Sequence, residues 1–184
     1  MAAELTARIA GIADAEAIAR IYVDAWRSAY AGIVPDRVLV RMSVAGQARE
    51  WTRALSRRAT AERIMVAEQP DGGIIGFGSM GEARSPGLPH AGEIFTLYVA
   101  PEHQEQGVGR MLLYRLFDGL IDSGLNSALV WVLADNPARF FYEAMGGRRV
   151  GEKLRRLWNA DLPQAAYGWN DLRIVPRRGG LRAG

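Results

Sequence analysis

The stretch EIFTLYVAPEHQEQGVGRMLL, residues 93–113, places a glycine- and amide-rich turn between a strand-like run and a helix-like run. The first run ends at Val99, Pro101 follows, and Gly107 and Gly109 stand where an amphipathic helix begins. Successive backbone amides and the positive N-terminal end of a helix bind anions, and glycines let phosphate oxygens approach the backbone closely. The turn therefore predicts a diphosphate-binding loop, with an ordinary glycine-rich turn as the alternative.

The turn does not match two widespread phosphate-binding motifs. The dinucleotide fingerprint needs G-x-G-x-x-G, and the Walker loop needs Gly-Lys followed by Ser or Thr. Residues 104–109 read Q-E-Q-G-V-G instead, and no Gly-Lys follows them. The turn shares with both motifs the backbone amides and the helix N-terminus that bind anions, but it does not share their sequence pattern.

The supply of chemically reactive side chains narrows the possible functions. The chain contains no cysteine and two histidines, His90 and His103. Disulfides, thiolate metal ligands and a covalent cysteine intermediate are therefore excluded, and no metal site is expected. A Ser-His-Asp triad is poorly supported, because Ser79 does not have glycines two residues away on both sides, as a nucleophile elbow requires.

Hydrophobic periodicity predicts an α/β fold with a mixed central sheet and helices on both faces. Apolar runs predict strands at 6–12, 62–68, 73–82, 93–99, 127–133, 148–158 and 166–172. Helical spacing predicts helices at 15–30, from 35, at 44–57, 109–124 and 137–146. Asp14, Ser43 and Asn136 are the expected N-terminal caps of three of these helices.

Length and charge predict one domain over residues 1–172 and a basic, flexible tail over 173–184. Residues 148–184 hold nine Lys or Arg and three Asp or Glu, so this end could meet an anionic partner. A solvated final hairpin and tail is the preferred interpretation, and no nucleic-acid partner is expected, because basic and aromatic residues do not interleave. No signal-peptide pattern or long apolar run is present, so we expect no membrane partner and a cytoplasmic location.

Residues 93–113 and a second stretch, NPARFFYEAMGG at 136–147, together resemble the GNAT superfamily of N-acetyltransferases. In that family, a Q/R-x-x-G-x-G/A loop binds the pyrophosphate of acetyl-coenzyme A, and a later helix contains Phe-Tyr-Glu before a glycine. The order of elements matches over roughly residues 5–172. The resemblance implies a twisted sheet and direct attack of an amine on the thioester, without an acyl-enzyme.

The resemblance also implies which residues hold acetyl-coenzyme A. The backbone of Leu97, Tyr98 and Val99 is expected to bond the pantetheine arm as a strand would, and one of these amides to polarise the thioester carbonyl. The pyrophosphate loop is expected to comprise Gln104, Gln106, Gly107, Val108, Gly109 and Arg110. Asn136 is an expected cofactor contact, although helix capping explains it fully and Asp135 is the alternative.

Two residues are implied to move protons. Glu93 is expected to act as a base through a water molecule, with a solvated strand end as the alternative and His90 as a second candidate base. Tyr142 matches the tyrosine of Phe-Tyr-Glu, which donates a proton to the departing thiolate and lies against the cofactor. Trp26 and Tyr30 are expected to line the acceptor site, with simple packing as the alternative.

The leading hypothesis is an acetyl-coenzyme A-dependent N-acetyltransferase acting on the primary amine of a small molecule. The alternatives are acetylation of a protein N-terminus or side-chain amine, and a non-catalytic acyl-coenzyme A sensor. The presence of both Glu93 and Tyr142 favours catalysis. A homodimer is also expected, because closing strands in this family often build dimers.

Overall fold

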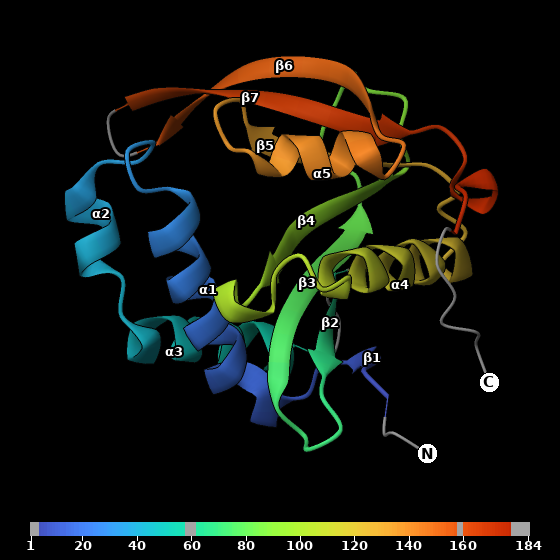
Figure 1. Cartoon of the computed structure of the whole chain (residues 1–184). Helices are drawn as coiled ribbons and strands as arrows, with labels where there is room; N and C mark the ends of the chain where they lie inside the picture. Colours follow the sequence, from blue (N-terminus) through green and yellow to red (C-terminus); the bar gives the residue numbers. More distant parts are fainter. Residues whose placement is uncertain (1–3, 58–61, 158–159, 178–184) are drawn as a thin grey trace.

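The computed structural model describes residues 4–57, 62–157 and 160–177. Within them, seven strands form one sheet in the order β1-β2-β3-β4-β5-β7-β6, in which only β4 and β5 are parallel neighbours (Figure 1). The strands are β1 (Thr6–Ile9), β2 (Arg63–Glu68), β3 (Ile74–Glu82), β4 (Gly92–Val99), β5 (Ala128–Leu133), β6 (Arg148–Leu157) and β7 (Ala160–Trp169). The α-helices are α1 (Ala15–Ala29), α2 (Asp36–Arg41), α3 (Val44–Ser56), α4 (Val108–Asp122) and α5 (Ala138–Ala144).

Helices cover both faces of the sheet, as adjacent residues of β2 show. Val66 packs with Ile18 of α1, whereas Ala67 packs with Leu112 of α4 on the opposite face. Glycine in β3 lets α4 approach closely, because a Cβ at Gly78 would stand 2.7 Å from a leucine side chain of that helix. The predicted mixed α/β fold with helices on both faces is confirmed.

Of the three predicted helix caps, those at Ser43 and Asn136 form as expected, and that at Asp14 does not. The Ser43 hydroxyl accepts a hydrogen bond from the Gly46 amide at 3.1 Å and caps α3 as expected. Asp14 precedes α1 but makes no capping bond to it. Its carboxylate accepts bonds from the Arg8 guanidinium at 2.7 and 2.9 Å and from the Gly11 amide at 2.7 Å. A charged, two-pronged donor is a stronger partner than a helix amide.

The last strand starts earlier than predicted. β7 begins at Ala160 rather than at residue 166, and Pro163 lies inside it although proline is disfavoured in central strands. The Pro163 carbonyl accepts a bond from the Ala134 amide at 2.9 Å, immediately after β5 ends at Leu133. The missing proline N–H faces the same side, just beyond the end of β5, so only the return bond to the Ala134 carbonyl is absent, and the Arg139 guanidinium donates to that carbonyl at 3.1 Å instead.

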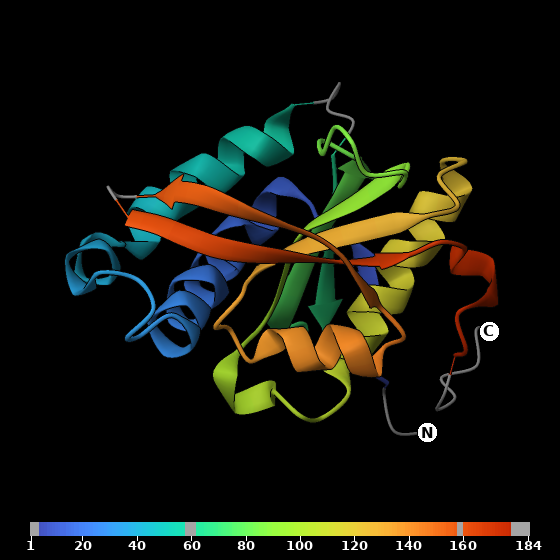
Figure 2. The same ribbon diagram turned by 90° about the horizontal axis from the view of Figure 1, so that it is seen from above.

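β4 and β5 separate soon after they meet. Residues 92–94 pair with residues 128–130, and the two strands do not pair beyond that point. On its other side, β4 has a β-bulge at Phe95, where the register with β3 shifts between Ser79 and Met80. A bulge bends its strand. Figure 1 shows the two halves of the sheet diverging, with β5, β6 and β7 apart from β1 to β4, and Figure 2 shows the strands of the two halves crossing when seen from above. The divergence leaves one edge of β4 without a partner strand.

The chain returns to α4 after β7. Leu172 is fully buried, and the Tyr114 hydroxyl on α4 donates a hydrogen bond to the Pro176 carbonyl at 2.9 Å. Residues 173–177 of the predicted tail therefore lie against the domain, while 178–184 fall outside the described residues. In the described part of the chain, no helix is long and apolar enough to cross a membrane.

Candidate active site

The free edge of β4 presents the backbone of two residues. The Ala100 amide donates to the Ile75 carbonyl at 2.9 Å, and residues along an antiparallel ladder turn their polar groups to alternate sides. The backbone of Tyr98 therefore faces β3, whereas that of Leu97 and Val99 faces the free edge. Of the three strand residues assigned to the cofactor, Leu97 and Val99 are the two whose backbone faces this edge, and the Val99 carbonyl there already accepts a bond from the Gln104 side chain.

The loop between β4 and α4 is braced by its own amide side chains. Gln104 donates to the Val99 carbonyl at 3.1 Å, and Gln106 donates to the Glu102 carbonyl at 2.9 Å. The backbone φ of Glu105 is +61°, an unusual conformation for a residue with a side chain. These bonds, together with those from the His103 and Gln104 amides to the Ala100 and Pro101 carbonyls, hold the loop in one shape.

The N-terminus of α4 is built to receive an anion. Gly107 precedes the helix with a φ of +86°, which favours glycine, and its carbonyl accepts the first helical bond, from the Met111 amide at 3.0 Å. The first four amides of a helix have no acceptor inside the helix. Those of residues 107–110 therefore point out of this 15-residue helix, beside the Arg110 guanidinium. The arrangement fits a diphosphate.

The two sequence motifs meet in space. A Cβ at Gly109 would stand 3.7 Å from the Phe141 ring of α5 and 3.7 Å from the Val99 side chain. The glycine thus lets the start of α4, the end of β4 and α5 pack together. Asn136 is buried, and its Oδ1 accepts a bond from the Ala138 amide at 2.9 Å, so it caps α5 as predicted.

Tyr142 lies in α5 with its ring against the core. Its ring centroid is 5.2 Å from that of Phe141 and 6.3 Å from that of Trp169. Burial raises the pKa of the Tyr142 hydroxyl, and the nearby Tyr30 hydroxyl raises it further. The hydroxyl has no hydrogen-bond partner among the described residues, so it remains a protonated, uncommitted donor at neutral pH.

Trp26 and Tyr30 join the first helix to β4. Their rings are 4.5 Å apart, and the Trp26 indole N–H donates to the Tyr98 hydroxyl at 3.1 Å. Because Tyr30 also influences the pKa of Tyr142, the end of α1 faces α5 across the divergence of the sheet. Of the two residues predicted for the acceptor site, Tyr30 is thus near the predicted proton donor, and Trp26 contacts Tyr30.

Glu93 is buried and partnered, so the alternative of a solvated strand end is wrong. Its Oε2 accepts bonds from the Arg84 amide at 2.8 Å and from the Ser85 hydroxyl at 3.2 Å. The Ser85 oxygen accepts in turn from the Trp131 indole at 2.7 Å. Lys153 lies 3.7 Å over the Trp131 ring. The other carboxylate oxygen, Oε1, makes no hydrogen bond within the described residues and is not sealed from solvent.

His90, the second candidate base, is packed into the sheet. It is 6% exposed, and neither ring nitrogen has a hydrogen-bond partner among the described residues. A Cβ at Gly168 would stand 2.5 Å from its Nε2. Leu129 of β5 pairs with Glu93 of β4 on one side and with Gly168 of β7 on the other. His90 lies against Gly168, whose backbone is two strand spacings, about 10 Å, from that of Glu93. Glu93 and His90 therefore lie at different positions on the sheet, and they do not act on the same proton.

Sequence reasoning missed Gln164. This side chain is 7% exposed, and its Oε1 has no hydrogen-bond partner within the described residues. It stands between Leu133 of β5 and Lys153 of β6, on the face where Leu133 packs with Tyr30. A buried, unpaired amide costs free energy unless a ligand or water completes it. Its only sequence signal was a glutamine beside Pro163, outside the predicted strand.

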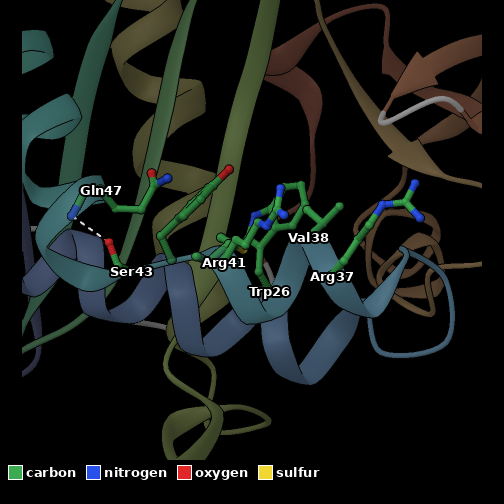
Figure 3. A pocket seen from close by; sticks show the side chains of 9 residues that line it. Trp26, Arg37, Val38, Arg41, Ser43 and Gln47 are labelled. Atoms are coloured by element: carbon green, nitrogen blue, oxygen red, sulfur yellow. Dashed lines mark hydrogen bonds between the residues drawn. The ribbon is translucent and has the colours of Figure 1, made fainter.

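A pocket of about 500 Å³ opens between α1, α2 and α3 (Figure 3). Trp26 forms part of the pocket wall, and its indole N–H also donates to the Tyr98 hydroxyl. The pocket therefore adjoins Tyr98 of β4. Among the described residues, no group of three or more His, Asp or Glu side chains could hold a metal ion.

Comparisons with known proteins agree with this geometry. Residues 16–147 match the model of the acetyltransferase (GNAT) family. The chain is 32% identical to the uncharacterized N-acetyltransferase YuaI of Bacillus subtilis, over 91% of this chain and 94% of that protein. It is 33% identical to the L-amino acid N-acyltransferase MnaT of Escherichia coli, over 61% of this chain and 62% of that protein.

The fold is similar to that of a solved relative with its cofactor bound. The structure of yncA, a putative acetyltransferase from Salmonella typhimurium with acetyl-CoA, superposes with a TM-score of 0.66 at 24% identity, covering 92% of this chain and 94% of that one. The chain belongs to the acetyltransferase (GNAT) family and is an acetyl-CoA-dependent N-acetyltransferase.

Proposed function

We propose that the protein transfers the acetyl group of acetyl-CoA directly to the primary amine of a small molecule. The observation that carries the proposal is the free edge of β4, where Leu97 and Val99 lead into the unpaired amides of α4. Acetyl-CoA, when bound, supplies an acetyl group activated as a thioester. The chain supplies positioning and two proton-transfer groups.

The backbone holds the two ends of the cofactor. Leu97 and Val99 would bond the extended pantetheine arm, and the amides of residues 107–110 with Arg110 would hold the diphosphate. The side chains of Gln104 and Gln106 act by keeping the loop in shape. Asn136 acts by capping α5, which carries Tyr142 to the same place.

Glu93 and Tyr142 divide the proton transfers. Glu93 accepts the proton of the acceptor ammonium, through a water at the free Oε1, so that the neutral amine can form the new N–C bond. As the C–S bond breaks, the Tyr142 hydroxyl would donate its proton to the sulfur, and the second proton lost by the attacking nitrogen would restore the hydroxyl. Glu93 is held by the Arg84 amide and Ser85, and Tyr142 by ring packing, so both groups are fixed before an acceptor arrives.

The pocket beside Trp26 supports a small acceptor. Its volume of about 500 Å³ is within the range of small-molecule sites. The name of the Escherichia coli relative, an L-amino acid N-acyltransferase, supports the same class of acceptor. The volume and the relative's name favour a small amine over a protein amine. The presence of a candidate proton donor, Tyr142, and a candidate base, Glu93, favours an enzyme over a sensor.

A thiol-release assay with a panel of amines and peptides tests the proposal. We expect free coenzyme A to appear only with both acetyl-CoA and a small primary amine, and mass spectrometry to find the acetylated amine. Tight acetyl-CoA binding without acetylation of any amine or peptide would favour the sensor, and acetylation of peptides alone would favour a protein acceptor.

A further inference from the structure

We propose that the acceptor amine also carries an anionic group, a carboxylate or a phosphate monoester, which is bound by Arg41 and Arg37 in the pocket between α1, α2 and α3. This inference rests on the proposed function and names the acceptor more closely.

The pocket is lined by cations and by no acid. Its polar lining consists of Arg37, Arg41, Ser43 and Gln47, and Tyr22 and Trp26 form an aromatic wall (Figure 3). Arg37 and Arg41 are four residues apart on α2, so they share one face of that helix. Two guanidinium groups on one face of a pocket can bond a single carboxylate or phosphate through several N–H groups.

Further positive charge surrounds the same space. Arg27 of α1 donates to the carbonyl of Met42, a lining residue, at 2.9 Å. Burial raises the pKa of Tyr22 to about 12, and the positive charge of Arg155 on β6 opposes this rise, so Arg155 approaches from another element. Within the described residues, Arg41 makes no ion pair or hydrogen bond. Such a cluster of cations repels itself and attracts an anionic ligand.

A second pocket shows that this charge is particular to one side of α1. It measures about 440 Å³ and is lined by three acidic side chains, Glu16, Asp24 and Glu102, and by Arg20. Arg20 is already paired with Glu16 at 2.9 Å. A cationic acceptor would be drawn to that side, whereas the pocket next to Trp26 selects for negative charge.

Trp26 connects the anion pocket to the reaction centre. It forms part of the pocket wall, stacks with Tyr30 at 4.5 Å and donates to the Tyr98 hydroxyl at 3.1 Å. Tyr30 is near enough to Tyr142 to affect its pKa. An acceptor with its anionic group beside Arg41 would therefore direct its amine past Trp26 towards Tyr142, and the anion would fix its orientation.

Matched acceptor pairs test the inference. Each pair has the same carbon skeleton with and without the anion: L-amino acids against their amides, and O-phosphoethanolamine against ethanolamine. We expect kcat/KM to be about ten- to a hundredfold higher for the anionic member of one pair, as charge-assisted bonds predict. Arg41→Gln should remove this preference mainly by raising KM for the anionic member, with a much smaller effect on the neutral member. Arg49→Gln, on α3 outside the pocket, should keep the preference.

The outcomes separate this inference from the proposed function. A preference for the amino acids identifies a carboxylate site, and a preference for O-phosphoethanolamine identifies a phosphate site. Equal kcat/KM within both pairs, or a preference that survives Arg41→Gln, would overturn the inference while the acetyltransferase function stands. If neither member of any pair is acetylated, the proposed function fails and the inference fails with it.

Discussion

Ile94 of β4 pairs with Val130 of β5, and it is the last residue of β4 to do so. The bulge at the next residue, Phe95, bends β4 away from its parallel neighbour. From this point the strand has a partner on one side only. A single interruption of register therefore provides the backbone edge on which the proposed cofactor site depends.

Gly107→Asp should abolish most acetyl-CoA binding. The substitution adds a side chain at a φ of +86° and a negative charge beside the proposed diphosphate. Loss of one or two charge-assisted bonds would lower affinity by about ten- to a thousandfold. Calorimetry measures the affinity, and circular dichroism checks the fold.

Gly124→Asp is the matched control for that change. Gly124 follows the other end of α4 and has a φ of +82°, so the backbone strain is similar. Its variant should bind acetyl-CoA normally. If both variants bind like the wild type, the glycines of the loop serve only to form a turn.

Glu93→Gln should lower turnover at neutral pH and leave acetyl-CoA affinity unchanged. The amide keeps the shape of the side chain but cannot accept the ammonium proton, and general base catalysis contributes about 10²–10⁴-fold. The deficit should shrink at high pH, where the acceptor amine is already deprotonated. Glu82→Gln, at the exposed end of β3, should behave like the wild type. A deficit that does not change with pH would argue against a basic role for Glu93.

Tyr142→Phe should lower turnover and change stability little. The hydroxyl has no partner among the described residues, so the ring packing against Phe141 and Trp169 is kept. A thiolate is a fair leaving group, so the loss should lie towards the lower part of the range of about 10²–10⁴-fold for general acids. Tyr114→Phe serves as the control for removal of a hydroxyl. Unfolding of the Tyr142→Phe protein would show that the hydroxyl is structural.

His90 should make stability depend on pH. Burial lowers the pKa of its imidazole, and nearby Asn170 only partly opposes this. An unfolded histidine titrates near about 6.5, so below that pH the unfolded chain binds the extra proton and the folded state loses stability. The loss continues until pH falls below the folded pKa. Urea unfolding at about pH 7.5 and about pH 5.5 measures it.

Only two histidines are present, so His103→Phe is a direct control for His90→Phe. The His103 variant should keep the dependence on pH, and the His90 variant should lose part of it. If stability falls equally between about pH 7.5 and about pH 5.5 in the two variants, His90 is not buried as a neutral side chain.

Local signals in the sequence predicted most of the elements. Ser43 and Asn136 accept capping bonds from the first turns of α3 and α5 as expected. Caps and glycine turns depend on a few neighbouring residues, so the sequence carries them directly.

Several features that the sequence did not predict depend on register between strands. The alternation that turns Tyr98 towards β3, the bulge at Phe95 and the placement of Gln164 between two strands require knowledge of cross-strand partners. Pro163 also misled the prediction, because its cost depends on where β5 ends. The basic pocket is likewise formed by helices whose mutual packing leaves no mark in a local pattern.

Amide hydrogen exchange, followed by NMR with and without acetyl-CoA, tests the central claim most directly. If the cofactor lies along the free edge of β4 and on the start of α4, the amides of Leu97, Val99 and residues 107–110 should become protected on binding. The Tyr98 amide, which already faces β3, should change little. Protection that appears elsewhere, or not at all at Leu97, Val99 and the loop, would contradict the account.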